Sequence, residues 1–86
     1  MDKKIVRKFV IVDWVDSAVE HGWQSEEPIS EPLRCKSAGW LMHDGDSCKV
    51  ISAHISEAGG YIDPMTIPIG CIRKIRVVKE LKDQGW

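Results

Sequence analysis

MTIPIGCIRKIRVV, residues 65–78, predicts a strand, a tight corner and a second strand. Pro68 has no N–H for a sheet ladder and Gly70 tolerates backbone angles that other residues resist, so the ladder must break here. After the corner, apolar and basic residues nearly alternate, with a slip at Arg73 and Lys74 where a β-bulge fits. A last strand that follows such a corner is typical of small barrels, in which it pairs with the first strand.

The stretches upstream of this corner predict three more strands. FVIVDW, residues 9–14, is apolar at the start of both faces, so we expect this strand to be covered on two sides. Its alternation places Val10, Val12 and Trp14 on one face. Residues 33–43 and 48–56 predict two strands joined by a hairpin turn at 44–46, because Asp-Gly supplies the positive φ values that tight turns need.

The remaining segments predict connections. Ser17 and Glu20 have the spacing of a capping box, so we expect at most one helical turn before Gly22. Residues 25–32, SEEPISEP, are acidic and contain two prolines, which predicts a surface loop. We expect the polar tail, residues 79–86, to fray.

These elements predict a single, mainly β domain over residues 1–86. An open sheet of this size would leave two edges exposed. We therefore expect either a small five-stranded barrel of the SH3-like or Sm-like kind or a strongly bent antiparallel sheet that is completed in a dimer.

Composition limits the function classes. A formal net charge of −1 over 86 residues argues against a dedicated binder of duplex nucleic acid or of an anionic membrane surface. Acidic residues end the N-terminal apolar run early, so we expect no signal peptide and no membrane span. The three cysteines form no CxxC pair, which favours a reducing cytosolic compartment. Four tryptophans exceed what so small a core readily encloses, so we expect a homo-oligomer with at least one ring at an interface or ligand site.

Aromatic and small polar residues near the predicted strand ends are the candidate ligand site. Stacking of a flat ligand on an indole contributes about 1–3 kcal/mol per base, enough for binding without a large basic patch. The alternative is that the indole rings of Trp14 and Trp40 fill the core. Basic residues on the strands could likewise meet phosphates or only discourage edge aggregation. The candidate ligand residues are Trp14, Asp16, Ser17, Trp23, Ser37, Gly39 and Trp40, and the basic residues are Arg34, Lys36, Arg73, Lys74 and Arg76.

Catalytic and metal-binding groups are few. Asp16, Ser17 and His21 include the residue types of a hydrolytic triad, but an exposed turn lacks the rigid geometry that a nucleophile and base require. His43, Cys48 and His54 could lie around a metal ion, but their spacing matches no recognised zinc site. We therefore expect no catalytic residues, no metal and no cofactor.

Short motifs along the chain resemble a family of small uncharacterised phage-encoded proteins. The motifs are V-x-V-x-W-x-D-S at residues 10–17 followed by Trp23, S-x-G-W-L at 37–41, and I-P-x-x-C-I-x-x-I at 67–75. This chain departs from the family in its acidic loop and in Gly70, where the family more often has serine or lysine.

The resemblance implies a non-enzymatic phage protein that acts in the host cytoplasm. Some viral families of similar size are sponges that sequester the nucleotide messengers of bacterial immunity, such as cyclic nucleotides. We therefore expect a protein that binds a small nucleotide-like ligand and counters host antiviral defence. Two alternatives remain open: a protein–protein inhibitor that docks a sheet edge or the acidic loop onto a host enzyme, and a single-stranded nucleic-acid-binding barrel, which the near-zero net charge disfavours.

Overall fold

The computed structural model describes residues 6–17 and 21–82, and β-strands dominate them, as predicted. The elements in chain order are β1 (Arg7–Asp16), β2 (Leu33–Asp44), β3 (Cys48–Ser52), β4 (His54–Ile55), β5 (Tyr61–Ile62), β6 (Met65–Pro68), a 3-10 turn η1 (Ile69–Cys71) and β7 (Ile72–Leu81). The described residues contain no α-helix. The predicted helical turn falls mainly on residues 18–20, which lie outside the described residues.

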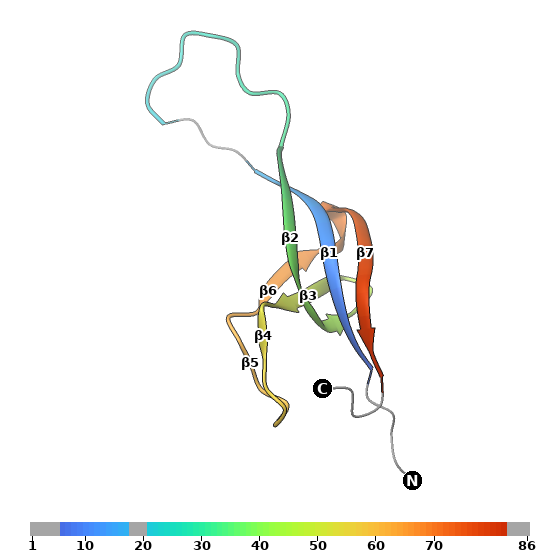
Figure 1. The fold of residues 1–86 in the computed structure, drawn as a ribbon. Helices are drawn as coiled ribbons and strands as arrows, with labels where there is room; N and C mark the ends of the chain where they lie inside the picture. Colours follow the sequence, from blue (N-terminus) through green and yellow to red (C-terminus); the bar gives the residue numbers. More distant parts are fainter. Residues whose placement is uncertain (1–5, 18–20, 83–86) are drawn as a thin grey trace.

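Five of the strands form one antiparallel sheet in the order β6-β3-β2-β1-β7 (Figure 1). The predicted pairing of the last strand with the first is confirmed, since β1 and β7 are hydrogen-bonded neighbours. The predicted hairpin at the Asp-Gly turn is also confirmed: the Gly45 amide donates to the Cys48 carbonyl at 3.1 Å between β2 and β3.

The corner at residues 68–71 has the predicted strand–turn–strand form. The amide of Ile69 donates to the Ser47 carbonyl at 2.9 Å, which ties the corner to the turn between β2 and β3. The predicted bulge is confirmed, because the register of β7 against β1 shifts between Lys74 and Ile72, leaving Arg73 as the extra residue.

The end predicted for the last strand is wrong. Strand β7 continues to Leu81, and its last residues pair with Phe9, Lys8 and Arg7 of β1. A polar sequence is compatible with this position, because β7 is an edge strand with residues 73–80 exposed. The prediction that residues 79–86 fray is therefore wrong for residues 79–81, and residues 83–86 lie outside the described residues.

The core is small and shows that the sheet is bent. Its fully buried apolar side chains are Val10, Val12, Ile51 and Ile67, from β1, β3 and β6. In a flat sheet β6 would lie about 14 Å from β1, since neighbouring strands are ~4.8 Å apart. One cluster from strands so far apart in the order requires the sheet to fold toward itself, and in Figure 1 β3 and β6 run across the direction of β1, β2 and β7.

The predicted closed barrel is not formed by the described residues, because β6 and β7 end the strand order without pairing with each other. Strand β6 has four residues and ends at Pro68, which has no N–H, so it offers little ladder to the ten residues of β7. As a result, Ile75 and Val77 of β7 are 38% and 53% exposed, so neither side chain belongs to the core.

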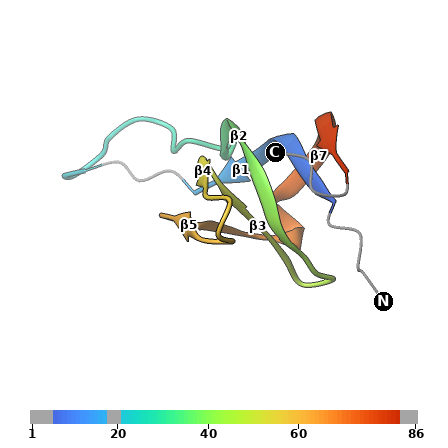
Figure 2. The ribbon, with the colours of Figure 1, turned by 60° about the horizontal axis from the view of Figure 1, so that its bottom comes forward.

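The predicted strand 48–56 is interrupted at Ala53, after which β4 and β5 form a separate two-stranded sheet (Figure 2). Buried Ser52 ties this hairpin to the main sheet. Its hydroxyl donates to the Ile62 carbonyl at 2.6 Å and accepts from the His54 amide at 3.3 Å.

Residues 21–32, here called the arm, connect β1 to β2 without strand or helix, and all are exposed. The predicted surface loop at residues 25–32 is confirmed. The arm extends away from the sheet in both ribbon views (Figures 1 and 2).

Candidate functional site

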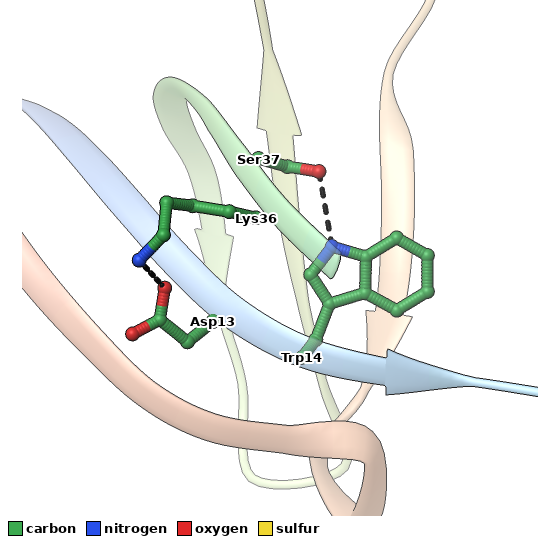
Figure 3. Close-up of polar contacts among 4 residues, drawn as sticks. All are labelled: Asp13, Trp14, Lys36 and Ser37. Carbon is green, nitrogen blue, oxygen red and sulfur yellow. Dashed lines mark hydrogen bonds and ion pairs between the residues drawn. The ribbon is translucent and has the colours of Figure 1, made fainter. Parts of the chain in front are cut away.

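Two of the predicted ligand residues are directly bonded to each other. The indole Nε1 of Trp14 donates to Ser37 Oγ at 3.0 Å, and the ring also packs against the core (Figure 3). Residue Ser37 pairs with Val12 in the β1–β2 register, two positions from Trp14, so both side chains lie on the same face of the sheet. This bond fixes the orientation of the half-buried ring.

Trp40 lies on the opposite face from Trp14. It pairs with Phe9 in the register, and the two rings meet edge to face with their centroids 5.2 Å apart. The pairing of β1 with β2 is regular from Phe9 to Asp16, so an odd and an even position of β1 face opposite sides. Trp14 and Trp40 therefore cannot stack on one small ligand.

Gly39 allows two strands to approach closely. A Cβ at this position would lie 2.9 Å from the Ser52 carbonyl oxygen of β3. Of the two expectations for this glycine, the close approach of another backbone accounts for it without a ligand.

The other three candidates lie at or beyond the end of β1. The carboxylate of Asp16 accepts from the Ser17 amide at 2.8 Å, and both residues are exposed. Trp23, in the arm, is 104% exposed, so its ring does not pack against the described part of the sheet. The structure thus brings Trp14 and Ser37 together and does not gather all seven candidates at one place.

A cleft of about 580 Å³ lies at this end of the sheet, beside Trp14. Small-molecule sites commonly occupy about 300–1,000 Å³, so the cleft has room for a small ligand. Its lining comes from β1, β2 and the bulge of β7: Asp13, Trp14, Val15, Arg34, Cys35, Lys36 and Arg73. Trp14 is the one predicted ligand residue in this lining.

Three cations and one carboxylate set the charge of the cleft. Asp13 lies on the face opposite Trp14, where its carboxylate forms an ion pair with Lys36 at 2.5 Å (Figure 3). The hydrogen bond from Lys36 holds the pKa of Asp13 below its usual value of 3.8. Because this pair is internally neutral, the net positive charge of the cleft comes from the guanidinium groups of Arg34 and Arg73.

The bulge positions one of these guanidinium groups. Arg73 is the extra residue of β7, and its Nη1 donates to the Gly70 carbonyl at 3.1 Å. Arg34 is exposed on β2, where it pairs with Val15, so its side chain lies on the same face as Asp13, opposite the indole of Trp14. Two guanidinium groups that line one cleft can bind an anionic group, and a guanidinium plane can also stack on a flat ring.

The sequence identifies the basic residues of the cleft but does not decide their role. The sequence predicts Arg34, Lys36 and Arg73 either as phosphate contacts or as edge protection. The structure shows that all three line one cleft, with Arg34 and Lys36 on the face of the sheet opposite the indole of Trp14. The register could not be derived from the alternation of each strand alone.

A second cleft, of about 390 Å³, lies toward the other end of the sheet. Its charged lining is mixed, since two carboxylates accompany Lys8, and Asp44 is already ion-paired with Lys49. This composition suits an anion less well than the cleft at Trp14. The lining residues are Val6, Lys8, Leu41, Met42, His43, Asp44 and Glu80.

Other kinds of site find little support in the described part of the chain. No three potential metal-ligating side chains gather within residues 6–17 and 21–82. All three cysteines are free thiols. None of the described helical segments is long and apolar enough to cross a membrane.

No known protein family, curated protein or solved structure matches this chain.

Proposed function

We propose that this protein is a non-enzymatic binding protein that captures a small nucleotide-like anion in the cleft beside Trp14. The observation that carries the proposal is that two guanidinium groups, beside a carboxylate already paired with Lys36, line one space of about 580 Å³.

The two parts of a nucleotide match the two parts of the cleft. A base stacks on a guanidinium plane of the cleft, since arginine side chains stack on aromatic rings. Phosphate oxygens accept hydrogen bonds from Arg34 and Arg73, since guanidinium groups present paired donors in the geometry that phosphates accept. Asp13 does not repel the anion strongly, because Lys36 neutralises it.

The biological role in this proposal is sequestration. A phage protein that binds an immune nucleotide messenger in the host cytoplasm removes that messenger from its receptor without chemical conversion. The motif resemblance to small phage proteins supports this role, and the lining of the cleft is consistent with it.

We also infer that the fold is an open relative of the small SH3-like barrels. Support comes from the meander order of the five main strands and from the 3-10 turn that joins the two edge strands.

The test is a thermal-shift screen against mononucleotides, cyclic mononucleotides and cyclic dinucleotides, followed by calorimetry of any ligand that stabilises the protein. A ligand at 100 times its Kd stabilises the fold by about 2.7 kcal/mol. Arg34→Ala and Arg73→Ala should each weaken binding about tenfold or more, because each removes charged hydrogen bonds to the phosphate.

Lys79→Ala is the matched control, since this exposed cation lies on β7 outside the cleft. The proposal is contradicted if no member of the panel binds, which is the behaviour of a protein–protein inhibitor. It is equally contradicted if Lys79→Ala weakens binding as much as Arg34→Ala.

A further inference from the structure

The arm is an unusual segment for a monomer. Residues 21–32 are exposed throughout, and they include Trp23 and Ile29, which are 104% and 55% exposed. The side-chain hydrogen bonds recorded within it are local, from Gln24 to the His21 and Gly22 carbonyls. Exposed large apolar side chains are typical of surfaces that bind a partner. The arm therefore has the composition of an interface, although its apolar side chains are exposed in the single chain.

The arm is also acidic. It contains Glu26, Glu27 and Glu31 and no lysine or arginine. Its prolines at 28 and 32 have no N–H, so the arm cannot be a central strand, which needs hydrogen bonds on both sides. Prolines are compatible with an extended segment at a sheet edge.

Strand β7 has the complementary properties. It ends the strand order, so one side of its ten-residue backbone is unpaired in the described sheet. It exposes Ile75, Val77 and Val78 to solvent. It also exposes four basic side chains and one acidic one: Arg73, Lys74, Arg76, Lys79 and Glu80.

We propose that the arm of one copy lies along the β7 edge of a second copy, and that two such contacts form a symmetric dimer. Extended peptides commonly bind to exposed sheet edges by backbone hydrogen bonds, with side chains setting the partner. Here the glutamates of the arm lie among the cations of β7, while Trp23 and Ile29 cover apolar side chains of that strand. The same contact made twice gives a closed, isologous pair.

The partner is a second copy rather than the same chain. The arm joins its own sheet where Asp16 pairs with Leu33, and in both ribbon views it runs away from its own β7 (Figures 1 and 2). The charge match is between two segments of one sequence, so a second copy supplies both halves of it.

A charge-swap experiment tests this interface through the molecular mass measured by light scattering and sedimentation. One variant carries Glu26→Lys and Glu27→Lys, which makes its arm basic like its own β7. The other carries Lys74→Glu and Arg76→Glu, which makes its β7 acidic like its own arm. Each variant alone should be monomeric, or its dimer dissociation constant should rise at least tenfold, because like charges face each other at both contacts.

An equimolar mixture of the two variants should form a heterodimer, since both contacts then join opposite charges. The wild type should be a dimer at 100 µM, and its dissociation should increase with salt. Asp46→Lys is the control for charge change at an exposed site outside both surfaces, and it should leave the mass unchanged.

The proposal is overturned if the wild type is monomeric at 100 µM or if the mixture stays monomeric while both variants remain folded. A dimer that persists in both single variants would place the interface elsewhere and would also overturn it. Because the readout is mass without added nucleotide, failure here is distinguishable from failure of the proposed ligand site.

Discussion

Val10 and Val77 are paired residues on the same face of the same sheet, yet their surroundings differ completely. Val10 of β1 is 0% exposed, whereas Val77 of β7 is 53% exposed. The difference arises because β3 and β6 fold over β1 and contribute Ile51 and Ile67 to its cover, while no described strand extends past β7.

The alternating apolar residues of β1 and of β7 therefore have different roles. In β1 they build the core that folds the chain, and in β7 they remain available for a partner. An isolated sheet of this size with a free apolar edge is prone to association, and the basic residues of β7 restrict which partners it accepts.

The largest expected effect is at the buried side. Ile67→Ala should reduce the free energy of unfolding by about 2–5 kcal/mol, because it leaves a cavity in a core with few other apolar members. Ile75→Ala should reduce it by less than about 1 kcal/mol in dilute protein, since the side chain is already partly in water. Urea denaturation of both variants measures these losses. Equal losses of unfolding free energy would mean that the apolar side chains of β7 also belong to the core.

The close approach of β2 and β3 gives the next effect. Gly39→Ala should destabilise the protein by about 1–3 kcal/mol, because the new Cβ would meet the Ser52 carbonyl at 2.9 Å and force the strands apart. Gly70→Ala is the control, as no atom lies within 4 Å of its Cβ position. Thermal melts that rank these two variants in the opposite order would contradict the account of Gly39.

Removing the tie between the main sheet and the β4–β5 hairpin should have a smaller and more local effect. Ser52→Ala deletes the hydroxyl that bonds Ile62 and His54, at an expected loss of about 0.5–1.5 kcal/mol. Amide hydrogen exchange should accelerate in residues 54–62 and remain slow in β1. Ser47→Ala, at an exposed serine, should leave both regions unchanged, and uniform acceleration in Ser52→Ala would contradict a local role.

Much of the fold was predictable because its signals are local. The corner at Pro68, the Asp-Gly hairpin and the bulge at Arg73 all follow from residues with special backbone properties. Barrel closure was not predictable, since it depends on how far β6 extends beside β7, and alternation carries no information about that length.

The candidate site was predictable only in part for the same reason. Trp14 lines the cleft and Ser37 orients its ring, as residues of the predicted set. Trp40 and Gly39 were included because of their residue type, but register places one on the opposite face and uses the other for strand approach. The sequence predicts Arg34 and Arg73 as possible phosphate contacts, and their place in the lining of one cleft follows from long-range strand pairing.

The smallest expected effect is on the solvent-facing side of the sheet, in the pair of Asp13 and Lys36. Lys36 lowers the pKa of Asp13 in the folded protein below the value of about 3.8 that this carboxyl has in the unfolded chain. The pair therefore stabilises the fold fully when the pH is above 3.8. This contribution is lost as the pH falls through the lower pKa of the folded protein. Melting temperatures between pH 6 and pH 2 should therefore fall slightly further for the wild type than for Asp13→Asn. Parallel curves for the two proteins would show that the pair contributes nothing.

The central claim is that the apolar side chains of β1 form the core while those of β7 bind a partner. The most direct test is the concentration dependence of the melting temperatures of Val10→Thr and Val77→Thr. The substitution is identical and both residues remain β-branched. Val10→Thr should lose about 1–3 kcal/mol at every concentration, because its hydroxyl is buried without a partner. Val77→Thr should melt with the wild type at 1 µM and fall below it at 100 µM, where the wild type gains stability by association. If Val77→Thr instead melts as early as Val10→Thr at 1 µM, the β7 row is part of the core and the account is contradicted.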